Sequence, residues 1–163
     1  MLLLNNVHDL ANNYFDTAVK HRRHLHANPE LSFEEENTAK YIQTVLEENK
    51  VSYKANIAGH GIVALIEGKN PASKTIALRG DMDALPITEI NEVPYKSTIK
   101  GVMHACGHDA HTSSLLGAAH ILSKLKNDFE GTVKLIFQPA EEKFPGGASL
   151  MIKEGVLKNP EPS

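Results

Sequence analysis

The sequence has no tryptophan and a single cysteine, and aromatic residues make up only 6% of its 163 positions. One cysteine excludes an internal disulfide framework, so Cys106 is free to act as a thiol or as a metal thiolate. No apolar run approaches the roughly 20 residues of a membrane-spanning helix. The segment Met1–Leu4 lacks a basic flank and is too short for the apolar core of a signal peptide. We therefore expect a cytoplasmic protein without a membrane partner.

Neither positive nor negative charge dominates, because the chain has 17 lysines and arginines and 20 acidic residues, for a formal net charge of -3. The densest basic group, Lys20–His24, is short. This balance argues against nucleic acid as a partner. Hydrophobic residues at 41% and a length of 163 residues are typical of one globular domain or a large part of one.

Hydrophobic periodicity predicts an alternation of helices and strands along the chain. We expect helices over residues 9–27, 34–49, 109–126 and 147–154, and strands over residues 51–57, 62–66, 75–78 and 132–137. Ser32 followed three residues later by Glu35 has the pattern of a capping box for the second helix. The order of elements favours a three-layer α/β/α domain over a helical bundle or an all-β fold.

The segment His104–His111 gathers three histidines, Cys106 and Asp109 within eight positions. Thiolate and imidazole groups bind borderline transition metals, and Gly107 allows Cys106 and His108 to turn toward one ion. Asp109 can cap the following helix or accept a hydrogen bond from His108. The segment therefore predicts a metal site. We expect structural or surface roles for the histidines elsewhere, among them His8, His21, His60 and His120.

Two acidic pairs, Asp81 with Asp83 and Glu141 with Glu142, come directly after predicted strands. In open α/β sheets, ligand and catalytic groups gather at the carboxyl ends of strands. A spacing of two places Asp81 and Asp83 on one side of an extended chain, although a solvated turn explains this pair equally well. In the second pair, one glutamate can bind metal while the other serves as general base.

A nucleophilic cysteine is the main alternative to a metal site, with Cys106 attacking an amide and a nearby histidine as base. A nucleophile, however, has no use for so many neighbouring metal-binding side chains and two acid pairs. The sequence contains no Gly-x-Ser-x-Gly motif, and Gly146-Gly147 lacks the Lys-Ser/Thr ending of a phosphate-binding loop. We therefore favour the metal site.

Four motifs, in this order, resemble the N-terminal half of the metallo-amidohydrolases: HANPELSF, RGDMDALP, MHACGHDAHT and FQPAEE. This family includes N-acyl-amino-acid amidohydrolases, hippurate hydrolases, indoleacetyl-amino-acid hydrolases and N-acetyldiaminopimelate deacetylases, within the aminoacylase/carboxypeptidase superfamily. The resemblance covers residues 20–159. The motifs are specific for the family and only weakly specific for the substrate.

The resemblance implies a centre of two divalent metal ions, manganese or zinc, with Cys106, His108 and Glu142 as ligands. Glu141 would be the general base, and Asp83 would orient a ligand or tune the site. The implied reaction is hydrolysis of the amide bond of an N-acyl amino acid or short peptide. A truncated, catalytically inactive fragment that keeps a partial metal site is the alternative.

The resemblance also implies a zinc-exopeptidase-like α/β/α catalytic domain, with an inserted domain for dimerisation and lid contacts in full-length members. Residues 1–163 would then form the N-terminal part of the catalytic domain, without the inserted domain or the C-terminal part. A homodimer is expected of the full-length form only. Asp81 falls where distant relatives carry a histidine ligand, so its role stays open. His104 and His111 are expected to support the ligands or the helix start.

Overall fold

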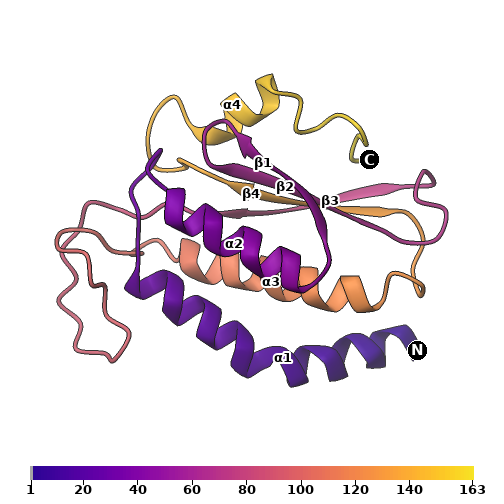
Figure 1. Cartoon of the computed structure of the whole chain (residues 1–163), viewed down its shortest axis with the longest axis horizontal. Helices are drawn as coiled ribbons and strands as arrows, with labels where there is room; N and C mark the ends of the chain where they lie inside the picture. Colours follow the sequence, from indigo (N-terminus) through magenta and orange to yellow (C-terminus); the bar gives the residue numbers. More distant parts are fainter. Residues whose placement is uncertain (1) are drawn as a thin grey trace.

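The computed structural model describes residues 2–163, which form four helices and one four-stranded sheet (Figure 1). The helices are α1 (Leu2–Ala27), α2 (Glu36–Glu48), α3 (His108–Lys124) and α4 (Gly147–Lys153). The strands are β1 (Ser52–Ile57), β2 (Gly61–Glu67), β3 (Thr75–Asp81) and β4 (Thr132–Gln138). Each element predicted from the sequence is therefore present. Within residues 2–163, no helix is both long and apolar enough to cross a membrane.

The sheet has the strand order β1-β2-β4-β3 and is mixed. β1 pairs with β2 and β2 with β4 in antiparallel fashion, whereas β3 and β4 are parallel. In the parallel pair, Thr75 lies opposite Thr132 and Asp81 lies opposite Gln138. Because parallel strands end at the same edge, the residues that follow β3 and β4 meet there.

Helices cover both faces of the sheet, with α1, α2 and α3 on one side and α4 on the other (Figure 1). Leu46 of α2 and Leu116 of α3 are fully buried with Leu135 and Phe137 of β4 in the larger core. Ile136, between the last two, belongs to a second apolar cluster with Met151 of α4. This alternation along β4 places apolar side chains on both faces. The prediction of a three-layer α/β/α domain is confirmed.

Helix α1 begins at Leu2, seven residues before the predicted start, and ends at Ala27 as predicted. Leu3 and Val7 line an apolar hollow together with residues from the end of α3 and the following loop, Leu122, Leu125 and Phe129. Contact with another element thus continues the helix through the polar Asn5-Asn6 pair, which local sequence alone does not favour.

The predicted capping box before α2 is wrong. Glu35 precedes the helix but makes no side-chain cap, and Ser32 donates its hydroxyl hydrogen elsewhere. The cap is Glu30, whose carboxylate accepts hydrogen bonds from the amides of Asn37 at 3.1 Å and Thr38 at 2.7 Å. A carboxylate at a helix N-terminus satisfies free amides and complements the helix dipole. Ser32 and Glu35 are consequently available for other contacts.

His21 has a structural role, as predicted. The buried ring joins α1 to α2, because Nε2 lies 2.9 Å from the hydroxyl of Tyr14 and Nδ1 lies 2.7 Å from the hydroxyl of Tyr41. Burial lowers the pKa of His21, which favours the neutral ring that both donates and accepts. His120 is likewise engaged, stacked on Tyr14 and bonded to Asn49.

Candidate metal centre

The residues expected to bind metal meet where β3, β4 and the start of α3 come together. Cys106, His108 and Glu142 each offer one ligand atom, and these atoms lie within 4.8 Å of one another. His108 is buried, Cys106 is exposed, and the side chain of Glu142 is 23% exposed. The fold therefore gathers the three predicted protein ligands at one point that is open to solvent.

Asp83 orients the His108 ring. Nδ1 of His108 lies 2.8 Å from the backbone carbonyl oxygen of Asp83 and 3.2 Å from its Oδ1. Both partners are acceptors, so Nδ1 carries a hydrogen, and in the neutral ring Nε2 keeps a free lone pair. Nε2 faces Oε1 of Glu142 at 3.7 Å and Oδ1 of Asp81 at 3.6 Å. The nitrogen that is free to bind a cation thus faces two carboxylates.

The hydrogen bond between His108 and Asp83 shifts the pKa of both side chains. Burial alone would lower the pKa of His108, but its bond to Asp83 and the charges of Asp81 and Asp83 raise it. Burial alone would raise the pKa of Asp83, yet hydrogen bonds from His108, Ser32 and the backbone of Glu142 and Glu141 hold it below the usual range. Asp83 therefore stays ionised beside the ring.

Gly107 precedes α3 and offers no side-chain cap. Oδ1 of Asp109 accepts from the amide of Ala110 in the first turn at 2.9 Å, so the expected contact with the helix start is present. The expectation that Asp109 accepts from His108 is wrong. Oδ2 of Asp109 instead accepts from Nε of Arg22 at 2.7 Å and from Nδ1 of His26 at 2.8 Å. Asp109 therefore ties the start of α3 to α1, a contact that its position next to His108 does not reveal.

His26 joins that contact to the loop between β3 and α3. Its Nε2 lies 3.1 Å from Oε1 of Glu89, a buried carboxylate whose Oε2 accepts from the amide of Ser97 at 2.7 Å. Sequence reasoning noted His26 only as part of the HANPELSF motif, and gave Glu89 no role. No local pattern identifies the pair, because the two residues are 63 positions apart.

Asp81 and His111 form a second close group with His108, again with ligand atoms within 4.8 Å of one another. Nδ1 of His111 lies 2.7 Å from Oδ1 of Asp81, and Nη1 of Arg79 lies 2.9 Å from Oδ2. Both oxygens of Asp81 are therefore already paired with cationic or donor groups. The Asp81 carboxylate, whose role the sequence left open, borders the ligand cluster on the β3 side.

His104 belongs to neither group of close ligand atoms, although it lies in the same motif. The ring is only 4% exposed, and neither nitrogen has a hydrogen-bond partner among the described residues. Burial lowers the pKa of His104 to about 4. The residue is therefore a neutral, buried ring.

Glu141 and Glu142 lie side by side in the loop after β4. The amide of Glu142 donates to Oδ2 of Asp83 at 3.0 Å, which fixes the backbone of this loop next to His108. Glu141 is exposed. The loop thus directs one glutamate toward the ligand cluster and leaves the other at its open side.

A thiolate, an imidazole nitrogen and a carboxylate form a donor set that fits zinc and related divalent ions. A hydrogen bond with Glu142, burial and the charges of Glu142, Glu141 and Asp81 raise the pKa of the Cys106 thiol. A bound cation would favour the thiolate and relieve repulsion among these carboxylates. The residues present therefore fit a metal centre.

Known proteins are similar to this chain in sequence. The chain is 49% identical over 147 residues to the IAA-amino acid hydrolase ILR1-like 5 of Arabidopsis thaliana and 47% identical over 136 residues to the N-acyl-L-amino acid amidohydrolase of Geobacillus stearothermophilus. These matches cover 90% and 83% of the chain but only 33% and 36% of those proteins. The chain thus spans about a third of the length of these curated relatives.

The crystal structure of the Bacillus subtilis YXEP protein, described as a dinuclear metal binding peptidase, superposes with a TM-score of 0.83 at 41% identity. The superposition covers 90% of this chain and 40% of that one. The sequence profile of Peptidase family M20/M25/M40 matches residues 77–163, more than half of the chain. This stretch contains Asp83, Cys106, His108 and both glutamates. The chain therefore belongs to Peptidase family M20/M25/M40.

Proposed function

We propose that this chain contributes to a metal-dependent hydrolase that cleaves the amide bond of N-acyl amino acids or short peptides. The observation that carries the proposal is the convergence of Cys106, His108 and Glu142 within 4.8 Å, at the edge where β3 and β4 end. The relatives named as amino-acid amidohydrolases support the substrate class. A small-molecule substrate is consistent with the ordinary charge balance of the chain.

The proposal assigns Cys106, His108 and Glu142 as protein ligands of a site for two divalent ions, manganese or zinc. A divalent ion bound there would act as a Lewis acid and lower the pKa of a water molecule. Asp83 keeps His108 in the tautomer whose Nε2 can bind, through the contact at its Nδ1. The chain's own contribution is thus the orientation of the ligands before metal arrives.

The proposed general base is Glu141, which is exposed beside the ligand Glu142. A carboxylate in this place can take a proton from the attacking water and deliver it to the leaving amino group. The products are then a carboxylate and a free amino acid.

A catalytic cysteine is disfavoured by the surroundings of Cys106. A nucleophilic cysteine needs a lowered pKa, whereas a hydrogen bond with Glu142, burial and neighbouring carboxylates raise this one. The proposal further assigns residues 1–163 to the N-terminal part of a cytoplasmic catalytic domain. It assigns homodimer formation to the full-length form.

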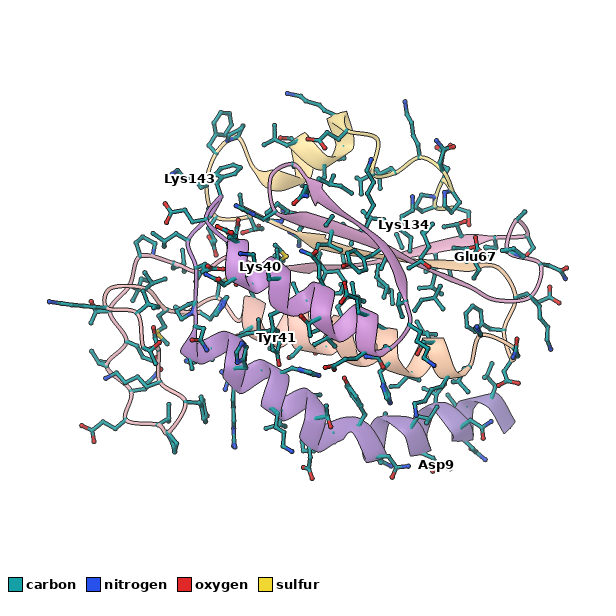
Figure 2. The ribbon with its side chains drawn as sticks, viewed as in Figure 1. Asp9, Lys40, Tyr41, Glu67, Lys134 and Lys143 are labelled. Carbon is teal, nitrogen blue, oxygen red and sulfur yellow. The ribbon has the colours of Figure 1, made fainter. Side chains whose placement is uncertain are left out.

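The test is release of free amino acid from N-acetyl- and N-benzoyl-amino acids with added Mn²⁺ or Zn²⁺. We expect Glu141→Gln to retain bound metal and to lose most turnover, by the 10²–10⁴-fold that is roughly typical of a general base. Glu67→Gln, an exposed glutamate at the far end of β2, is the matched control (Figure 2). Near wild-type turnover in Glu141→Gln would show that Glu141 is not the general base. A chain that binds no metal and releases nothing would overturn the proposal.

A further inference from the structure

Glu35 is fully buried, and it contacts the loop after β4 rather than its own helix. Its side chain is 0% exposed, and Oε1 accepts a hydrogen bond from the amide of Ala140 at 2.7 Å, across 105 positions of sequence. Ala140 is the residue directly before Glu141 and Glu142. A carboxylate from the turn before α2 therefore holds the backbone that leads to the proposed base and ligand.

The conformation of Ala140 needs such a restraint. Its φ of 48° lies in the left-handed region, which is unfavourable for a residue with a Cβ atom. Strained backbone of this kind persists where its surroundings hold it, and such sites are often functional. The bond to Glu35 supplies one of these restraints at the residue where the chain turns out of β4.

A second buried carboxylate holds the same loop from its other end. Oδ2 of Asp83 accepts from the amide of Glu142 at 3.0 Å and from the hydroxyl of Ser32 at 2.6 Å. Ser32 and Glu35 belong to one short segment before α2, so this segment contacts both Asp83 and the Ala140 amide. The backbone from Ala140 to Glu142 is thereby fixed at both ends.

Stabilisation of the fold does not by itself explain why a glutamate is buried at position 35. Its Oε2 is buried without a hydrogen-bond partner among the described residues, which is costly for a carboxyl group. Burial raises the pKa of Glu35, and the nearby Asp83 charge raises it further, against hydrogen bonds that lower it. The capping of α2 is supplied by Glu30 and leaves no such duty to Glu35. A buried acid with one oxygen left without a partner is retained most readily where it has a role other than stability.

We propose that Glu35 is a positioning residue of the metal centre, whose bond to the Ala140 amide places Glu142 next to Cys106 and His108. This inference rests on the proposed function, because it concerns the ligand that Glu142 provides. Glu35 itself touches neither ligand nor substrate. Its effect is exerted through the backbone of the loop.

The test is titration of the chain with Co²⁺, followed by the near-ultraviolet absorption that arises when a thiolate binds cobalt. Glu35→Met fills a similar space but leaves the Ala140 amide without an acceptor. We expect its affinity for Co²⁺ to fall by about 10- to 100-fold, the range for groups that orient metal ligands. Glu35→Gln keeps an acceptor oxygen and should restore the affinity of the wild-type chain.

Glu30→Met is the matched control, because it removes the same side chain five positions away and abolishes the α2 cap. We expect this variant to lower the free energy of unfolding while Co²⁺ affinity stays unchanged. Equal affinity in Glu35→Met and wild type would overturn the inference. So would a loss in Glu35→Gln as large as in Glu35→Met, since the acceptor would then be irrelevant.

Glu35→Asp makes the same test if Glu35→Met does not fold, because a shorter carboxylate withdraws from the Ala140 amide while its charge is kept. Weaker Co²⁺ binding by Glu35→Asp supports the inference, and unchanged binding refutes it. Failure of the proposed function has a different signature. In that case the wild-type chain itself gives no thiolate-to-cobalt absorption.

Discussion

The ring of His108 is anchored twice by Asp83, with Nδ1 at 2.8 Å from the carbonyl oxygen and 3.2 Å from Oδ1. Oδ2 of the same carboxylate accepts from the hydroxyl of Ser32 and from the amide of Glu142. Asp83 thus accepts hydrogen bonds at both oxygens, and it connects two of the three proposed ligands through a single side chain.

Asp83→Asn should weaken metal binding by about 10- to 100-fold. An asparagine can accept at only one end, so its amide group would face either His108 or the donors Ser32 and Glu142. Competition with a chromophoric chelator for Zn²⁺ measures the affinity. Asp16→Asn, which removes the same charge from an exposed position on α1, should have no effect. Unchanged affinity in Asp83→Asn would show that this anchor is dispensable.

Cys106→Ala should lower the metal content of the purified chain and abolish the thiolate-to-cobalt absorption. The thiolate is the only sulfur ligand that the chain can offer from cysteine, because no second cysteine exists. Elemental analysis after gel filtration checks the content. Ser114→Ala, at an exposed position on α3, is the control. A metal content equal to that of wild type would remove Cys106 from the ligand set.

His104 should make the metal-free fold sensitive to acid. Its pKa falls from 6.5 to about 4 on folding because of burial. Below pH 6.5 the unfolded chain therefore binds more protons, so stability is lost as the pH falls from 6.5 toward 4. The loss from this group amounts to about 3 kcal/mol.

His104→Leu should remove that part of the acid dependence without loss at pH 7.5, since neither ring nitrogen has a partner to lose among residues 2–163. Urea unfolding between pH 4 and 7.5, with a chelator present, measures the difference. His8→Leu alters an exposed histidine and should leave the pH dependence of wild type. Parallel curves for His104→Leu and wild type would contradict the prediction.

Lys134 should be a major stabilising residue of the segment after α4. Its side chain is buried on β4, on the α4 side of the sheet (Figure 2). Nζ donates to the carbonyl oxygens of Val156 at 2.8 Å, Lys158 at 2.9 Å and Pro160 at 2.6 Å. Lys134→Met leaves these acceptors without their donor.

We expect Lys134→Met to lower the free energy of unfolding by about 3 kcal/mol. It should also speed proteolytic cleavage within residues 156–160, because the bonds that hold this segment are lost. Thermal unfolding and limited proteolysis measure the two effects. Lys143→Met, at an exposed position in the loop after β4, should change neither (Figure 2). Wild-type behaviour of Lys134→Met would refute the prediction.

Errors in the sequence-based expectations share one cause. Ser32 and Glu35 have the spacing of a capping box, and Asp109 directly follows His108. Sequence reasoning therefore assigned each of them a hydrogen-bond partner nearby in the sequence. Asp109 keeps a local bond to the Ala110 amide. The other partners of these residues are Asp83, the Ala140 amide, and His26 with Arg22. Each of these lies more than 50 positions away along the chain. Local capping rules carry no information about such distant acceptors and donors.

Local sequence was sufficient for the elements and for a generic metal site, whereas the choice of Cys106, His108 and Glu142 as ligands came from the family resemblance. Helix and strand periods depend on neighbouring residues, and a metal-binding motif is dense enough to be recognised within eight positions. The roles of Glu141, Glu142, Cys106 and His108 stay predictions, although the fold brings them to one place. Only the tertiary structure decided that Asp83 faces His108 and that Glu35 faces Ala140. These contacts depend on the parallel register of β3 and β4 and on the packing of α2, which join segments that are far apart in sequence.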